Sequence, residues 1–141
     1  MGEFKWDEFK KGCSKLGCDS IDSWKKAVPK LNQEVSSEAK LHELYKFSFS
    51  FAQDKGKKNV DVELACSLWD LLIGQRCGFL NKWKAFCMQK YESNVLRVIT
   101  RDNWDLFWDL IKATRGDMRN FEDDGAWPAL IDEFVEYNEA N

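Results

Sequence analysis

The chain has 141 residues, of which 44% are hydrophobic and 14% aromatic, and its formal net charge is −3. This length and composition are typical of one folded domain with a single hydrophobic core, not of a disordered chain. The sequence contains no run of about twenty apolar residues and no apolar signal core near its N-terminus, so we expect a soluble intracellular protein.

The predicted elements are helices, because apolar residues recur at helical spacing and strand alternation is scarce. A first helix is predicted over residues 4–16 and is stopped by the glycine that follows. A second stretch, residues 20–35, begins with a capping serine, and we expect Pro29 to kink or divide it. A third helix begins at Ser36 or Ser37 and is expected to be largely buried.

Four further helices are predicted in the second half of the chain. One covers residues 62–74 behind a capping aspartate, another covers residues 79–91, Thr100 or Asp102 opens the next, and Pro128 opens the last. The predicted fold class is therefore all-α, a single compact domain of about seven helices.

The first residues, GEFKWDEF, are similar to the second half of an EF-hand loop that runs into its exit helix. Gly2 would stand at the sharp turn, Phe4 at the apolar position and Glu8 at the bidentate carboxylate. The acids of the first half of such a loop are absent, so we predict no calcium site and expect the domain to begin inside a degenerate EF-hand-like motif. A calcium-responsive helical module is the alternative function that this motif leaves open.

Metal binding and catalysis find little support in the residue pattern. The five cysteines form no CxxC pair and His42 is the sole histidine, so we expect reduced, buried thiols and no metal. There is no Gly-rich phosphate loop, GxSxG or HExxH, and no cofactor is expected. A hydrolase using Asp105 or Asp109 is the remaining catalytic alternative, and it would need a convergent pocket around one of them.

Charge is divided unevenly along the chain. Residues 1–100 carry 17 Lys/Arg and 13 Asp/Glu, whereas residues 101–141 carry 4 and 11. An acidic end repels phosphates and favours a cationic partner. On the last predicted helix, Asp132 and Glu136 lie beside the apolar stripe rather than in it, although a simple solvated face is the alternative explanation.

The segment DDGAWPALIDEFVEY closely resembles the C-terminal signature of the defective-in-cullin-neddylation family, whose domain is called the potentiating-neddylation domain. The resemblance continues upstream through RDNWDLFWDL, VELACSLWDLLIG, FLNKWKAF, LYKFSFSFA and KLGCDSIDSWKKAVPKL, so it covers essentially all of residues 1–141 in order. It implies an all-helical, non-catalytic scaffold that holds a cullin's C-terminal winged-helix region against the neddylation conjugating enzyme, beside the RING subunit, in nucleus and cytoplasm. The domain here would lack its N-terminal EF-hand-like helices.

The resemblance also implies two binding sites. The cullin-binding patch falls on Asp102, Ala126 and Asp132, where the small alanine would let the cullin approach and the acids would meet its Lys or Arg residues. The pocket for the acetylated N-terminus of the conjugating enzyme falls on residues of three predicted helices: Phe4, Phe51, Leu68 and Leu71. The sequence departs from the family pattern at two places. The family commonly has Tyr at the position of Leu68, and the segment SNVLRVIT before Asp102 is longer than expected.

Overall fold

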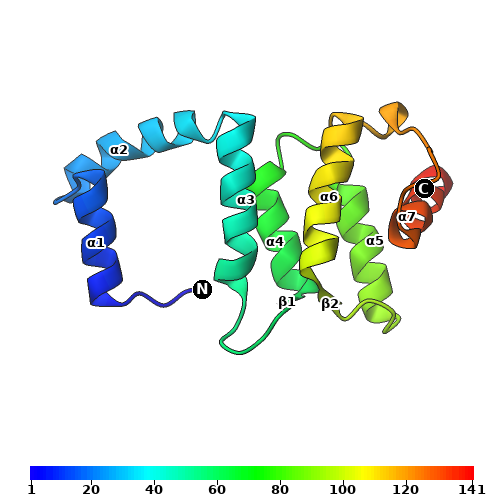
Figure 1. Cartoon of the computed structure of the whole chain (residues 1–141), viewed down its shortest axis with the longest axis horizontal. Coiled ribbons are helices and arrows are strands. Elements are labelled where there is room, and N and C mark those ends of the chain that lie inside the picture. The colour runs from blue at the N-terminus through cyan, green and yellow to red at the C-terminus, as the bar shows by residue number, and fades with distance from the viewer. The chain divides into compact units, whose positions relative to one another are not determined.

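The computed structural model describes residues 1–141 and is built almost entirely of helices, which confirms the all-α class (Figure 1). None of the helices combines the length and the apolar character needed to cross a membrane. The chain forms two compact units, Met1–Phe51 and Ala52–Asn141. The elements in chain order are α1 Trp6–Leu16, α2 Ile21–Glu34, α3 Glu38–Ala52, β1 Val60–Asp61, α4 Val62–Ile73, α5 Leu80–Glu92, β2 Val98–Ile99, α6 Arg101–Thr114, the 3₁₀ helix η1 Met118–Asn120 and α7 Ala129–Ala140.

Local signals set the helix ends of the first unit. Gly17 ends α1 in the left-handed conformation with φ of 68°, which glycine adopts without steric cost. Ser20 begins α2 with a reciprocal capping box, in which its side chain accepts from the backbone of Ser23 and the Ser23 side chain accepts in return. Pro29 was predicted to kink or divide this stretch, and the division is wrong, because α2 continues through this residue as one helix.

The EF-hand-like beginning of the chain is not confirmed. Gly2 has a positive φ of 86°, as a sharp turn requires, but residues 1–5 form no helix and α1 follows them directly. Glu8 lies exposed on α1. Across residues 1–141, no three His, Cys, Asp or Glu side chains converge in a way that could hold a metal ion.

The third helix buries only one face, so the expectation that it is largely buried is wrong. Leu41, Tyr45 and Phe49 are buried at a spacing of four residues, which is one stripe of a helix. Phe47 and Phe51 lie on another face, 60% and 49% exposed, and their rings stack at 5.5 Å.

The core of the second unit is a cluster of aromatic rings contributed by four helices. Trp69 of α4 stacks on Trp104 of α6 at 5.3 Å. Trp83 of α5 stacks on Phe107 of α6 at 4.4 Å, and Phe134 of α7 meets Trp83 edge-on at 5.0 Å. All five side chains are completely buried, and rings of this size contribute the largest apolar areas to a core. The aromatic residues of this half of the chain are therefore mostly structural.

A minimal antiparallel pair brings the beginnings of α4 and α6 together. Val60 faces Ile99 and Asp61 faces Val98. Thr100 then caps α6 with a capping box, because the Asn103 backbone N–H donates to Thr100 Oγ1 at 3.1 Å and the Thr100 N–H donates to Asn103 Oδ1 at 3.3 Å. These contacts fix the first turn of α6, where Asp102 lies.

Candidate functional site

The last helix presents an acidic face to solvent. Its buried side is made by Ile131 and Phe134, while Trp127 and Leu130, which the sequence placed in the same stripe, are only half-buried. α7 contains no Lys or Arg, and its four acids are all exposed: Asp132, Glu133, Glu136 and Glu139. Glu133 is paired with Lys90 of α5, so the other three acids dominate the charge of this face.

Asp132 lies in the first turn of α7, where the aligned peptide dipoles favour a negative charge. Pro128, which was predicted to open the helix, is its N-cap residue, so α7 begins one position later, and the Pro128 carbonyl accepts the Asp132 backbone N–H at 3.4 Å. The carboxylate itself has no partner within the chain and stays in water. It is therefore available to a cation from another molecule.

Ala126 is exposed in a loop that is shaped by two aspartates. The Gly125 backbone N–H donates to Asp123 at 2.9 Å, and the Ala126 N–H donates to Asp124 at 3.0 Å. Such turns, in which a carboxylate replaces a backbone acceptor, hold the chain in a fixed path. Asp-Asp-Gly is itself a turn signal that could be recognised in the sequence.

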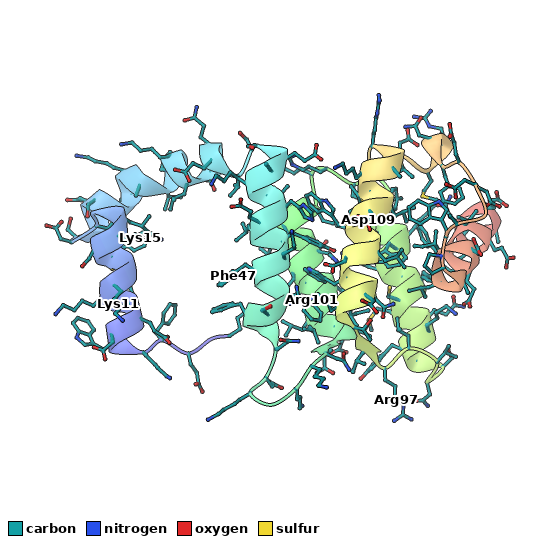
Figure 2. The ribbon with its side chains drawn as sticks, viewed as in Figure 1. Lys11, Lys15, Phe47, Arg97, Arg101 and Asp109 are labelled. Carbon is teal, nitrogen blue, oxygen red and sulfur yellow. The ribbon has the colours of Figure 1, made fainter.

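Asp102 is exposed in the first turn of α6, beside Arg101, which Figure 2 labels at the beginning of that helix with Asp109 toward its other end. The loop that contains Ala126 approaches the far end of α6, because Ala113 and Trp127 line one small hollow. The eleven positions from Asp102 to Ala113 correspond to about 16 Å of helix.

The three residues of the predicted cullin-binding patch thus share exposure but make no direct contact. Ala126 and Asp132 lie on either side of the Trp127–Pro128 turn, while Asp102 belongs to a separate helix. No hydrogen bond or ion pair joins the three. The patch assignment stays a prediction.

The four residues of the predicted conjugating-enzyme pocket differ in their surroundings. Phe4 and Phe51 belong to the first unit and are 86% and 49% exposed. In the second unit, Leu71 is 83% exposed on α4, whereas Leu68 is buried and contributes to the core. Three of the four side chains therefore offer apolar surface to solvent, and the pocket itself stays a prediction.

The first unit also contains an apolar hollow that sequence reasoning missed. It has a volume of about 620 Å³ and lies between α1 and α2, where its apolar lining is Trp6, Phe9, Cys13, Ile21 and Trp24. None of the four predicted pocket residues lines it. The signal in the sequence was the amphipathic pattern of both helices. The structure leaves both helices without a buried residue, so their apolar faces line this hollow.

The cysteine thiols are poorly suited to nucleophilic chemistry. All five are free, and Cys18, Cys77 and Cys87 are buried. Burial raises the pKa of Cys66 to about 11 and that of Cys77 to about 12, and it also raises the pKa of Cys87. These three thiols therefore stay protonated at neutral pH, and the thiolate is the reactive form.

Comparison with known proteins identifies one family. Residues 23–137 match the family model described as cullin binding. The chain is 35% identical to "Defective in cullin neddylation protein 1" of Caenorhabditis elegans, over 99% of this chain and 53% of that protein. It is 32% identical to "DCN1-like protein 5" of Pongo abelii (97% and 56%) and 33% identical to "DCN1-like protein 3" of Xenopus laevis (97% and 46%). The chain spans about half the length of these relatives.

Proposed function

Because the chain belongs to the cullin-binding family, we propose that it is a non-catalytic scaffold that promotes the neddylation of cullins, in nucleus and cytoplasm. It binds the C-terminal winged-helix region of a cullin and the acetylated N-terminus of the conjugating enzyme, which carries out the transfer beside the RING subunit. The scaffold contributes by holding the two partners together, since tethering turns an encounter into an intramolecular event.

The acidic face of α7 is the observation that carries this proposal. Asp132 and Glu136 are exposed and unpaired on a helix without any Lys or Arg, and the exposed alanine Ala126 lies close by in sequence. Charges in this arrangement steer a basic partner and select it more than they increase affinity. The absence of a side chain larger than methyl at Ala126 lets a partner backbone approach the loop.

Calorimetry of this chain with a cullin C-terminal domain tests the cullin half of the proposal. We expect Asp102→Ala, Ala126→Arg and Asp132→Ala each to weaken binding by about tenfold, because each removes a charge contact or blocks the approach. Raising the salt concentration should weaken wild-type binding, since exposed charges are screened within about 10 Å at 0.1 M salt.

Asp22→Ala is the matched control for Asp102→Ala. Asp22 is also an exposed acid in the first turn of a helix with a capping box, it lies outside the predicted patch, and its loss changes the net charge equally. Unchanged affinity for Asp22→Ala together with weakened binding for Asp102→Ala supports a localised patch. Wild-type-like affinity in all three patch variants contradicts it.

Fluorescence polarisation with an acetylated N-terminal peptide of the conjugating enzyme tests the other half. Leu71→Asp and Phe4→Ala should weaken binding, because both side chains are largely exposed and can contact a ligand without supporting the core. Val95→Asp, which alters another exposed apolar residue, should have no effect. Equal binding of the acetylated and unacetylated peptides would count against a pocket for the acetyl group.

A further inference from the structure

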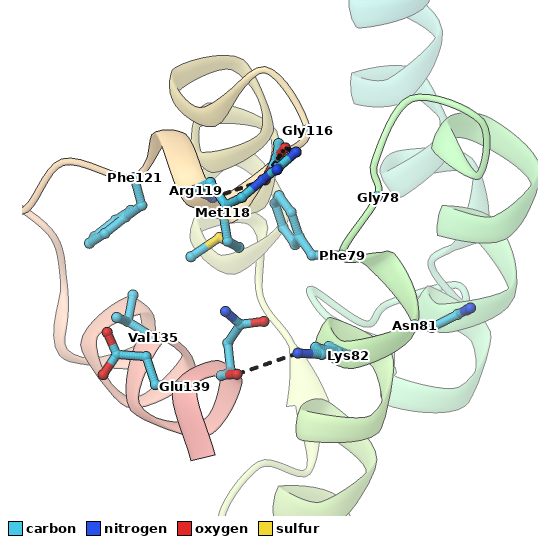
Figure 3. A pocket seen from close by; sticks show the side chains of 12 residues that line it. Gly78, Phe79, Asn81, Lys82, Gly116, Met118, Arg119, Phe121, Val135 and Glu139 are labelled. Carbon is cyan, nitrogen blue, oxygen red and sulfur yellow. Dashed lines mark hydrogen bonds and ion pairs between the residues drawn. The ribbon is translucent and has the colours of Figure 1, made fainter. Parts of the chain in front are cut away.

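A concave site of the second unit outside the predicted patch lies between the beginning of α5, η1 and α7. It is open to solvent, has a volume of about 570 Å³, and is lined on its apolar side by Phe79, Met118, Phe121 and Val135. In Figure 3 the side chains of Met118, Phe121 and Val135 point into the space between η1 and α7. We call it the α5–α7 pocket, and its size is within the range of sites that accept small ligands or single side chains.

Gly78 and Gly116, which line the α5–α7 pocket, lie where two backbone segments cross closely. The Gly78 N–H donates to the Gly116 carbonyl at 2.8 Å. Gly116 has φ of +76°, and a Cβ at this position would lie 2.2 Å from the carbonyl oxygen of Arg76. Only glycine at position 116 permits this approach. Neither Gly78 nor Gly116 has a side chain that could fill the pocket.

The cations around the pocket are already engaged within the chain. The Arg119 guanidinium makes a bidentate contact with Asp117, with the shortest N–O distance at 2.6 Å. Lys82 Nζ donates to the Asn138 carbonyl at 3.4 Å near the end of α7, drawn as a dashed line in Figure 3. Glu139 on the α7 side of the pocket has no hydrogen-bond or ion-pair partner within the chain, while Lys82 keeps its positive charge because a neutral carbonyl does not compensate it.

One face of α7 connects this pocket to the predicted cullin-binding patch. Asp132, Val135 and Glu139 follow one another at i, i+3 and i+7, which places them on a single stripe of the helix. Val135 and Glu139 line the pocket, and Asp132 lies at the beginning of the same stripe. A partner that contacts Asp132 can therefore continue along α7 into the pocket.

We infer that the α5–α7 pocket receives one aliphatic or aromatic side chain of the cullin segment that binds Asp132, with flanking Lys or Arg residues of that segment facing Asp132 and Glu139. The inference rests on the proposed function, because the segment belongs to the same basic partner. The apolar lining supplies the burial, and the acids on the stripe select a basic sequence around the anchor.

Filling the pocket tests the inference. Val135 is half-buried at the pocket wall, so Val135→Trp occupies the space from a position that is open to solvent. Calorimetry with a cullin C-terminal domain should show binding weakened by about tenfold, the effect expected for losing an anchor side chain. Ala140→Trp is the matched control, because it adds the same side chain to an exposed position of α7 outside the pocket, and its affinity should equal that of wild type.

A second variant and the salt dependence separate this effect from misfolding and from loss of charge contacts. Val135→Lys places a cation at the wall and should also weaken binding, while both Val135 variants keep the wild-type melting curve. The decline of affinity with salt should stay unchanged in Val135→Trp and become shallower in Asp132→Ala, since only the latter removes a charge.

Each outcome decides between the two proposals. Wild-type affinity in both Val135 variants, with Asp132→Ala weakened, overturns the pocket and leaves the proposed function standing. Absence of binding by the wild-type chain overturns the proposed function and the pocket together. Equal weakening by Val135→Trp and Ala140→Trp also overturns the pocket, because the effect would not depend on filling it.

Discussion

Lys90 in the last turn of α5 forms an ion pair with Glu133 near the beginning of α7. The ammonium group also lies 5.2 Å from the centre of the Phe86 ring, and the Lys90 side chain is only 18% exposed. Glu133 is the neighbour of Asp132 in sequence, so the ion pair anchors the turn that carries the proposed cullin contact. The contact that orders this turn is thus separate from the carboxylate that remains free to bind.

Lys90→Met should lower the melting temperature. The substitution keeps the apolar stem over Phe86 and removes the charge, so we expect a loss of about 1 kcal/mol in the free energy of unfolding, at the upper end of values for partly exposed pairs. Thermal unfolding followed by circular dichroism measures the loss. Lys55→Met, at an exposed lysine of the β1-proximal loop, is the control and should melt like wild type.

Gly116→Ala should destabilise the second unit strongly. The added Cβ would lie 2.2 Å from the Arg76 carbonyl oxygen, and the residue already has a positive φ, so we expect a loss of about 3 kcal/mol or more from backbone displacement and strain. Gly56→Ala is the matched comparison, because Gly56 also has a positive φ, of +80°, but has open space around it. Urea unfolding should show a loss of about 1 kcal/mol there, and equal losses at the two sites would contradict the crowding.

The capping box of α6 should contribute measurably to the free energy of unfolding. Thr100→Ala removes the acceptor for the Asn103 N–H, and we expect a loss of about 1 kcal/mol in chemical denaturation. Thr100→Ser keeps a hydroxyl at the same position and should restore most of that loss. A Ser variant as unstable as the Ala variant would show that the methyl group, not the hydrogen bond, stabilises the turn.

The thiols of Cys66 and Cys77 should be slow to alkylate in the native state. With the pKa of Cys66 raised from 9.0 to about 11, its thiolate population near neutral pH falls roughly a hundredfold. Mass spectrometry after iodoacetamide treatment should find Cys66 and Cys77 unmodified under conditions that label all five cysteines of the unfolded chain. Rapid native labelling of Cys66 would contradict the proposed environment.

The same pKa changes make stability depend on pH in the alkaline range. A thiol whose folded pKa lies above its unfolded value favours folding below the unfolded pKa, and this contribution is lost as the pH rises toward the folded value. For Cys66 and Cys77 the loss should begin near pH 9 and continue to about pH 12. Cys66→Ser should flatten part of this decline in urea midpoints measured across that range.

Features set by neighbouring residues could be predicted from the sequence. The end of α1 at Gly17 and the serine cap of α2 were predicted and are confirmed, and Thr100 is the one of two predicted residues that caps α6. The apolar stripe of α5 is buried as its spacing indicated. In each case the signal and the structure it produces lie within about one helical turn of each other.

Features that depend on distant residues could not be predicted. Asp61 occupies the predicted N-cap position, but its side chain makes no capping hydrogen bond. Its backbone instead pairs with β2, which α4 and α5 separate from it in sequence. Two residues are too few to show strand alternation. Of the two effects expected of Pro29, a kink or a division, the division does not occur, because α2 runs through this residue as one element.

The candidate site follows the same division. Charge and position in the sequence correctly suggested that Asp132 and Glu136 avoid the core. The buried state of Leu68, one turn from the exposed Leu71, required the packing of the second unit to be known. The α5–α7 pocket could not be predicted for the same reason. It depends on the close backbone crossing at Gly78 and Gly116, which the spacing of side chains in the sequence does not indicate.

The β1–β2 pairing has a consequence for how the second unit assembles. The α4–α5 helical hairpin lies between the two strands in sequence, so the strand pairing joins the two ends of the segment that contains this hairpin. Closing such a long loop has an entropic cost that two residue pairs are too few to offset. We therefore expect α4 and α5 to pack together before the two strands pair. For the same reason we expect the start of α6, and Asp102 with it, to take its final place only after α4 and α5 have packed together.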